Sequence, residues 1–211
     1  MKKSIVSLCL GAVILLSVDC KKNESDDNTS LVAALVALAN GNCFNVPQKV
    51  AVKDGNSSAV TTYTCAVVGK VYTCVPGTGN TVVRTYSSGV AAKLGVVDPP
   101  AFSNQHVQRG LTGRVEGTTT NTFTYNSSNQ LTAVASPTVT YSNYDTYGFP
   151  KTNSAGQTIT NTYASGATKP TTSSDGTMTY TYDSNGWATK IDFGFGQPTT
   201  AENTGSLAIC D

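Results

Sequence analysis

Residues 61–74 read TTYTCAVVGKVYTC, and this stretch decides the class of fold. Polar and apolar side chains alternate on both sides of a central Gly-Lys dipeptide, a pattern typical of two half-buried β-strands joined by a two-residue turn. Glycine at the first turn position suits a type II′ turn, which needs a positive φ there. The predicted hairpin places Val68 opposite Val71 and Cys65 directly opposite Cys74.

The register of this hairpin predicts the disulfides. Cys65 and Cys74 fall on a non-hydrogen-bonded pair, where side chains of facing strands come closest, as a disulfide requires. Cys43 and Cys210 then remain to join the two ends of the domain. Four cysteines allow three pairings, and a metal site is the alternative. We favour Cys65–Cys74 and Cys43–Cys210, because the chain has one histidine and no Cys-x-x-Cys motif for a metal.

The same strand-and-turn pattern extends in both directions from the hairpin. Residues 48–53, 59–68 and 81–86 are predicted strands bounded by Gly, Asn and Pro turns. Residues 87–118 are less regular and are interpreted as a long connection with room for a short strand. We therefore expect an all-β fold of consecutive antiparallel hairpins, forming a repeat sheet or partial barrel, with one short N-terminal helix. Residues 42–211 are expected to form a single disulfide-linked β-domain.

Four tyrosines in the second half of the chain stand 19 residues apart: Tyr125, Tyr144, Tyr163 and Tyr182. Asn or Asp follows three of them and can accept a backbone hydrogen bond at the first position of a type I turn. Gly or Asn lies three residues further on and tolerates the positive φ of a hairpin bulge. In the third copy Ala164 replaces the Asp.

These motifs, best preserved in Tyr144-Asp145-Thr146-Tyr147-Gly148 and Tyr182-Asp183-Ser184-Asn185-Gly186, resemble the YD repeats of the bacterial RHS family. The resemblance covers about residues 119–195. It implies that each copy forms a β-hairpin. In that family long arrays wind into a shell around a cargo, and four copies are too few to enclose anything.

The N-terminus has the layout of a secretory signal peptide: a basic start, an apolar run over 5–16, and then Cys20. A cysteine after such a run resembles the lipobox of bacterial lipoproteins. Ser17 stands where the common lipobox has Leu, and Asp19 precedes the cysteine, so the looser spirochaetal form is the better match. The resemblance implies that residues 1–19 are removed and that Cys20 carries lipid. Secretion without lipid is the alternative.

Two segments separate the lipidation site from the β-domain. Residues 20–30 are polar and resemble the tether of a lipoprotein, reaching about 17 Å over ten residues as a flexible coil. Residues 31–41 begin with LVAALVALA and predict a short apolar helix packed on the β-domain. A membrane-surface helix is the alternative, but this segment lacks a basic face.

The composition agrees with an exported protein. Charged residues make up 13% of the chain, against about 25% in an average soluble domain. The chain holds 32 Thr, 20 Ser and 16 Asn, which suit polar strand faces and turns. A net charge of +1 gives no electrostatic basis for binding nucleic acid.

The sequence offers little for catalysis. The only histidine, His106, is interpreted as an ordinary loop residue, and most acids lie in turns, where capping suffices. Phe193-Gly194-Phe195-Gly196 lacks the third glycine and the helix of a dinucleotide site. We predict no catalytic residue, no metal site and no cofactor.

The candidate binding residues are the hairpin-tip aromatics Tyr147, Phe149 and Trp187, which as exposed rings would suit a protein or glycan partner. Covering the sheet face is the alternative role. We therefore expect a non-enzymatic, adhesin-like or surface-structural lipoprotein. It would be anchored by lipid in a bacterial cell envelope, at the outer membrane or cell surface. The alternatives are an envelope glycan hydrolase and a protein–protein accessory or inhibitor module.

Overall fold

The structure, a computed structural model, describes residues 41–136 and 138–211. The predicted signal peptide, the lipidation at Cys20, the tether and the apolar helix, except for Gly41, lie outside the described residues. Within these residues no helix is long and apolar enough to cross a membrane.

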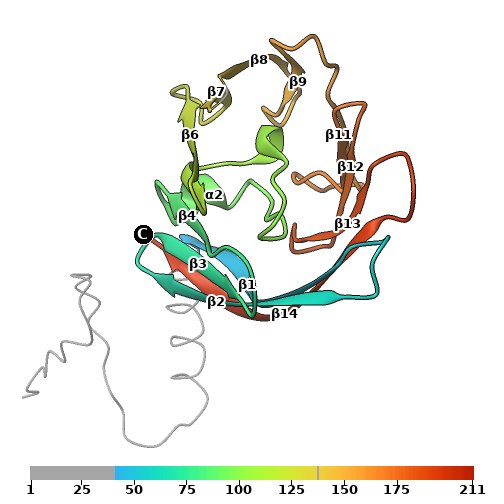
Figure 1. The fold of residues 1–211 in the computed structure, drawn as a ribbon. Coiled ribbons are helices and arrows are strands. Elements are labelled where there is room, and N and C mark those ends of the chain that lie inside the picture. The colour runs from blue at the N-terminus through green and yellow to red at the C-terminus, as the bar shows by residue number, and fades with distance from the viewer. Residues whose placement is uncertain (1–40, 137) are drawn as a thin grey trace, which may run out of the picture. The chain divides into compact units, whose positions relative to one another are not determined.

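The described part of the chain is built almost entirely from strands, which confirms the predicted all-β class (Figure 1). The strands are β1 (Cys43–Lys53), β2 (Val60–Val68), β3 (Val71–Pro76), β4 (Val82–Tyr86), β5 (Leu111–Glu116), β6 (Thr119–Tyr125), β7 (Leu131–Ala135), β8 (Val139–Tyr144), β9 (Pro150–Asn153), β10 (Thr160–Thr162), β11 (Thr172–Ser174), β12 (Thr179–Tyr182), β13 (Ala188–Asp192) and β14 (Thr199–Cys210). One α-helix, α2 (Gly89–Ala92), and one 3-10 helix, η1 (Gln105–Val107), lie between β4 and β5.

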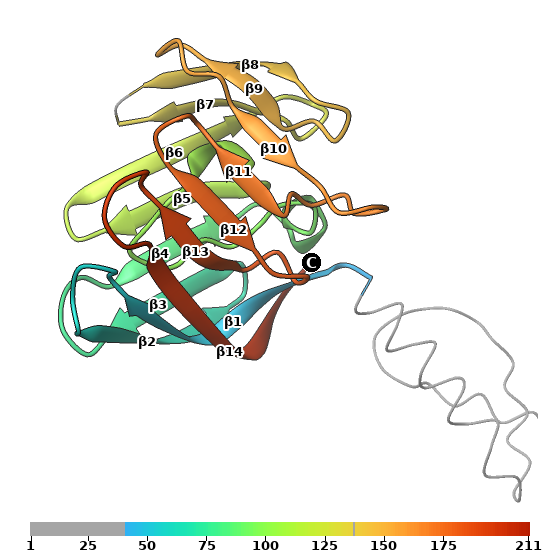
Figure 2. The same cartoon turned by 90° about the vertical axis from the view of Figure 1, so that its right-hand side faces the viewer.

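All fourteen strands belong to one antiparallel sheet in which every neighbour in space is also a neighbour in sequence, except that β14 pairs with β1. The order runs from β10 through β14 and β1 to β9. The edge strands β9 and β10 come close at the turn that joins them, where the amide of Ile159, just before β10, donates to the Lys151 carbonyl in β9 at 2.8 Å. The sheet therefore nearly closes into a barrel, as the ring of strands in Figures 1 and 2 shows.

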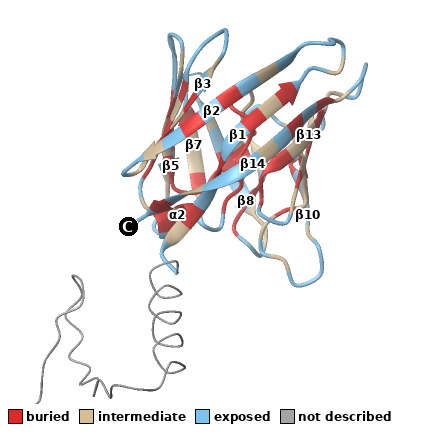
Figure 3. Cartoon of the chain, turned by 90° about the horizontal axis from the view of Figure 1, so that it is seen from below, coloured by how far each residue is buried: buried red, intermediate tan, exposed pale blue. Residues whose placement is uncertain are grey.

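The hairpin that decides the fold has the predicted register. Val68 pairs with Val71 and Cys65 with Cys74 across β2 and β3. Gly69 has a φ of 57°, as the first position of the turn requires. Buried and exposed residues alternate along β2, because successive side chains of a strand point to opposite faces (Figure 3).

Both predicted disulfides are present. Cys65–Cys74 joins neighbouring strands of the hairpin, and Cys43–Cys210 joins the start of β1 to the end of β14 across a separation of 167 residues. Cys43 and Cys210 are also partners in the β1–β14 ladder, whose pairs extend to Lys53 and Thr200. The first and last strands of the sheet are thus locked to each other by a ladder and a covalent bond.

Residues 87–110, here called the inner segment, run through the space inside the ring of strands (Figure 1). The sequence predicted only a long connection here. Its residues Val96, Val97, Val107 and Arg109 are buried, and the Val97 amide donates to the Gly186 carbonyl at 2.8 Å. The four tyrosine-based repeats do not surround the inner segment by themselves, because all fourteen strands build the ring.

Candidate functional site

The antiparallel order gives the sheet two ends with different turns. The end at which Cys43 and Cys210 lie, here called the Cys43 end, also carries the turns at 69–70, 126–130, 145–149, 163–171 and 183–187. The opposite end, here called the Phe195 end, carries turns that include 54–59, 77–81, 117–118, 154–159, 175–178 and 193–198. All four predicted tyrosine-based turns therefore lie at the Cys43 end.

The turn chemistry predicted at Asp145 and Asp183 is present in the structure. One oxygen of Asp145 accepts from the amides of Tyr147 and Phe149, each at 2.9 Å. Asp183 accepts in the same way from Asn185 and Trp187. Both turns include a glycine three residues on, with φ of 79° at Gly148 and 82° at Gly186.

Asn126 and Asn153 organise two more turns of this kind. The Asn126 side chain accepts from the amides of Ser128 and Gln130 at 3.0 Å. The Asn153 side chain accepts from Ala155 and Gln157 at 3.1 Å. The turn at Asn153 was not singled out from the sequence, because no tyrosine precedes it; its signal is the Asn-x-x-Gly spacing.

The three predicted binding aromatics do not form an exposed surface. Phe149 is buried under the Arg109 guanidinium, which lies 4.5 Å from its ring centroid. Trp187 is buried too, and its indole nitrogen donates to the Asn45 carbonyl at 3.0 Å. Only Tyr147 is exposed, and its ring packs on Tyr163. The prediction is wrong for Phe149 and Trp187, because both residues follow their turn glycine and point back into the ring of strands.

The most exposed aromatic residue in the described part of the chain is Phe195, at 75%. Its ring centroid lies 6.3 Å from that of Phe193, which in turn lies 6.2 Å from Phe102. The flanking glycines Gly194 and Gly196 have φ values of 75° and 72°. From the sequence this motif was considered only as a nucleotide site. An aromatic residue between two glycines was the signal that a ring projects from a turn.

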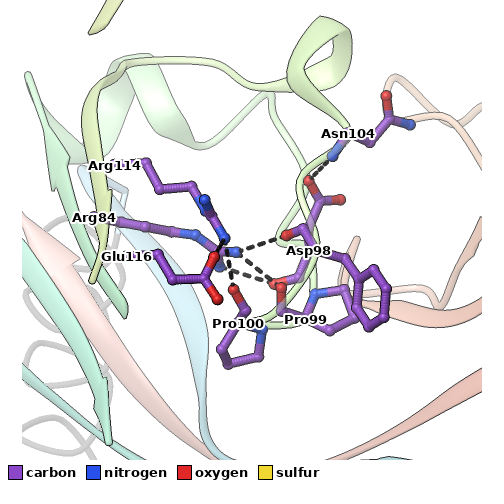
Figure 4. A network of polar contacts seen from close by, with 8 residues as sticks. Arg84, Asp98, Pro99, Pro100, Asn104, Arg114 and Glu116 are labelled. Carbon is purple, nitrogen blue, oxygen red and sulfur yellow. Dashed lines mark hydrogen bonds and ion pairs between the residues drawn. The ribbon is translucent and has the colours of Figure 1, made fainter. Parts of the chain in front are cut away.

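The inner segment is held by two buried arginines from the strands (Figure 4). Arg84 donates to the carbonyls of Asp98, Pro99 and Phe102 at 2.8, 3.0 and 3.3 Å. Arg114 donates to the carbonyl of Pro100 at 3.0 Å. Each guanidinium thus donates to backbone carbonyls of residues 98–102, which lie outside the strands.

Asp98 is the buried acid of this network. Its carboxylate accepts from the Asn104 amide at 2.5 Å, the Gln108 side chain at 2.7 Å and the Tyr182 hydroxyl at 3.1 Å. Burial raises the pKa of Asp98 to about 6, while the charge of Arg84 opposes the shift. Among the residues that the structure describes, Asp98 is the one buried Asp or Glu. It therefore has no second buried carboxyl group beside it in this part of the chain, as the two acids of a glycoside hydrolase would require.

The only histidine lies beside a serine, but the pair is not arranged as nucleophile and base. His106 Nε2 lies 2.9 Å from the Ser173 hydroxyl, which donates to Asn161 Oδ1 at 2.6 Å. Because the Ser173 hydroxyl donates to Asn161, it accepts a hydrogen bond from His106 Nε2–H and does not donate one to the ring. Both residues are buried, and burial lowers the pKa of His106 to about 4. This contact ties η1 to β10 and β11.

An open groove of about 520 Å³ lies at the Cys43 end, between residues 164–171 and Tyr182, Asp183 and Ser184. The Lys169 ammonium, which lines it, donates to the Asn185 carbonyl at 3.0 Å. The Asp183 carboxylate accepts the turn amides. Both charged groups of the groove thus already serve the fold. Across residues 41–136 and 138–211, no group of three or more His, Cys, Asp or Glu could hold a metal ion.

No protein-family model matches the chain, and no curated protein matches its sequence.

Proposed function

We propose that this protein is a non-enzymatic lipoprotein, anchored to a bacterial cell envelope through Cys20, whose β-domain binds a partner at the Phe195 end. The observation that carries this proposal is the placement of Phe195. Phe195 is exposed at one end of the sheet, and the described chain begins at the other end, next to Cys43. A ring at the end away from the anchor is the part of the domain best placed to meet a partner.

Export is supported by the two disulfides. Disulfide bonds form and persist in oxidising compartments, which include the bacterial periplasm and the cell surface. Cys65–Cys74 and Cys43–Cys210 use all the cysteines of the β-domain. This chemistry fits a chain that carries a signal-peptide layout and a cysteine placed for lipidation.

A binding role is favoured over hydrolysis by the surroundings of the polar residues. Burial raises the pKa of Asp98 and lowers that of His106, and both side chains hold the inner segment in place. Phe195, in contrast, has 75% of its surface free for a partner. Exposed aromatic rings stack on sugar rings or enter apolar pockets of proteins, so the partner is a glycan or a protein.

The anchor is tested by labelling cells with a palmitate analogue and comparing wild type with Cys20→Ala. We expect label on the wild type and none on the variant. Protease treatment of whole cells then reports exposure, and we expect the wild-type protein to be cleaved. An unlabelled wild type would contradict the anchor, and full protease resistance in intact cells would contradict a surface role.

The binding face is tested with arrays of immobilised glycans and of purified extracellular proteins. Phe195→Ala should lose binding to any ligand that the wild type selects. The matched control is Tyr147→Ala, an exposed aromatic at the Cys43 end, which should bind as wild type does. Retained binding by Phe195→Ala together with lost binding by Tyr147→Ala would place the site at the wrong end of the sheet.

A further inference from the structure

Three apolar side chains are exposed around the residue at which the described chain begins. Val68 is 79% exposed beside the β2–β3 turn, and Val90 and Leu94, on and just after α2, are 50% and 47% exposed. Val90 belongs to α2, and Leu94 lies two residues after the end of this helix.

Hydrogen bonds and an ion pair hold these residues at one place. The Lys93 ammonium donates to the Gly41 carbonyl at 3.0 Å, which fixes the start of the described chain beside α2. Asp211 accepts from the Val90 amide at 3.3 Å and lies 3.2 Å from the Lys70 ammonium. Lys70 belongs to the turn that follows Val68. We call Val68, Lys70, Val90, Lys93 and Leu94 the Gly41 patch.

The charges of the Gly41 patch suit a phospholipid surface. The charge of Lys70 is matched by Asp211, at 3.2 Å. Lys93 donates to the neutral Gly41 carbonyl and is in none of the three ion pairs among the described residues. The patch therefore combines exposed apolar side chains with an uncompensated cation, as surfaces that lie on anionic membranes do.

We propose that the Gly41 patch contacts the lipid bilayer that carries the anchor, with Val68, Val90 and Leu94 entering the headgroup layer. This inference rests on the proposed lipidation of Cys20. Twenty residues separate Cys20 from Gly41, so the covalent link enters the β-domain at the patch itself. Tethering raises the effective concentration of the patch at the bilayer, so three small side chains suffice where an untethered domain would need more.

Contact through the Gly41 patch fixes the orientation of the domain. The Cys43 end faces the bilayer, and the Phe195 end faces away from it. The patch would thus keep the Phe195 end directed toward partners outside the envelope layer.

The test places an environment-sensitive NBD dye on Leu94→Cys, with Phe195→Cys as the matched control, in the chain from residue 20 onward. One preparation carries the lipid, and the other carries a hexahistidine tag in place of Cys20. The vesicles contain phosphatidylcholine, phosphatidylglycerol and a nickel-chelating lipid. We expect the dye at position 94 to shift to the blue and to be quenched by headgroup spin labels, and the dye at position 195 to do neither. Val90→Asp should reduce the quenching at position 94 by roughly tenfold.

The outcomes separate the two proposals. Equal, water-like emission at both positions on tagged vesicles would overturn the contact. A blue shift at position 94 without vesicles would also overturn it, because residues 31–39 or a second copy would then cover the patch. If tagged protein shows the contact while Cys20 never acquires lipid in cells, the membrane-binding patch stands and the proposed anchor fails.

Discussion

The hydroxyl of Tyr163 donates a hydrogen bond to the carboxylate of Asp145, and this bond spans the opening between the two edge strands of the sheet. Asp145 follows β8, and Tyr163 follows β10, which begins after the β9–β10 turn. The Asn161 side chain donates to the same carboxylate oxygen at 3.5 Å. Asp145 therefore caps its own turn and also binds Tyr163 of the next tyrosine-based turn. That next turn has no acid of its own, because Ala164 stands in its place.

Tyr163→Phe should open this junction. Removing the hydroxyl leaves the ring in place but loses a hydrogen bond to a charged acceptor, worth about 1.5–3 kcal/mol of unfolding free energy. Amide hydrogen exchange should increase in β9 and β10 more than in β1 and β14. Tyr147→Phe, at the exposed partner ring 4.5 Å away, should change stability much less. Equal effects of the two substitutions would contradict the role of the Tyr163 hydroxyl.

The two disulfides should differ in their contribution to stability. In the chain-entropy view, closing the loop of Cys43–Cys210 stabilises by about 5 kcal/mol and closing that of Cys65–Cys74 by about 3 kcal/mol. The sequence separations are 167 and 9 residues. Urea unfolding of Cys43→Ser/Cys210→Ser and Cys65→Ser/Cys74→Ser measures the difference. A greater loss in the second variant would show that the β1–β14 ladder holds the ends without its covalent bond.

Arg84→Met should release the inner segment. The methionine keeps much of the volume but removes the hydrogen bonds to the carbonyls of Asp98, Pro99 and Phe102, of which Pro99 keeps the Phe102 amide as a donor. The loss should lower the free energy of unfolding by about 3–5 kcal/mol. The control is Lys190→Met, which removes a cation 3.3 Å from Asp192 on an exposed face and should cost less than about 1 kcal/mol. Hydrogen exchange at residues 96–108 should rise only in the arginine variant.

His106 should make the protein less stable in mild acid. Its pKa falls from 6.5 to about 4 because the ring is buried, so the unfolded chain binds a proton that the folded chain does not. The stabilisation is present above pH 6.5 and is lost as the pH falls toward 4, by up to about 3 kcal/mol. His106→Gln, which keeps a donor for Ser173, should remove this dependence in denaturant unfolding. A parallel pH profile for both proteins would contradict it.

Asp98 should act in the opposite direction. Its pKa is raised from 3.8 to about 6 by burial, so the folded chain holds a proton more tightly than the unfolded chain does. The resulting stabilisation is present below pH 3.8 and is lost as the pH rises through about 6. Relative to Asp98→Asn, the wild type should therefore lose stability between pH 4 and 7. Unfolding curves of both proteins at matched pH values measure this difference.

Phe149→Ala and Phe195→Ala should separate packing from binding. Phe149 is 1% exposed and Phe195 is 75% exposed. The first substitution should cost about 3–5 kcal/mol through the cavity that it leaves, and the second should cost almost nothing. Thermal unfolding checks both. A large loss in Phe195→Ala would mean that its ring serves the fold and would remove it as a binding residue.

Local patterns determined much of this protein. The alternation in TTYTCAVVGKVYTC and its Gly-Lys turn were enough to predict the register of β2 and β3 and the disulfide Cys65–Cys74, because a two-residue turn fixes which residues face each other. The remaining pair then followed by elimination. The caps at Asp145 and Asp183 were equally local, since donor and acceptor lie within four residues.

Only the tertiary structure decided which polar and aromatic residues are inside. Trp187 and Phe195 both stand in glycine-containing turns, yet one is buried and the other exposed. Trp187 follows its turn glycine and donates to the Asn45 carbonyl, whereas Phe195 lies between two turn glycines and projects from the turn. The inner segment has no strand or helix periodicity that predicts its place. It is held by Arg84 and Arg114, on the paired strands β4 and β5, whose side chains donate to carbonyls 14 residues away in the chain. Closure of β14 on β1 brings these strands around it. Such contacts depend on separations of many residues, which no local pattern records.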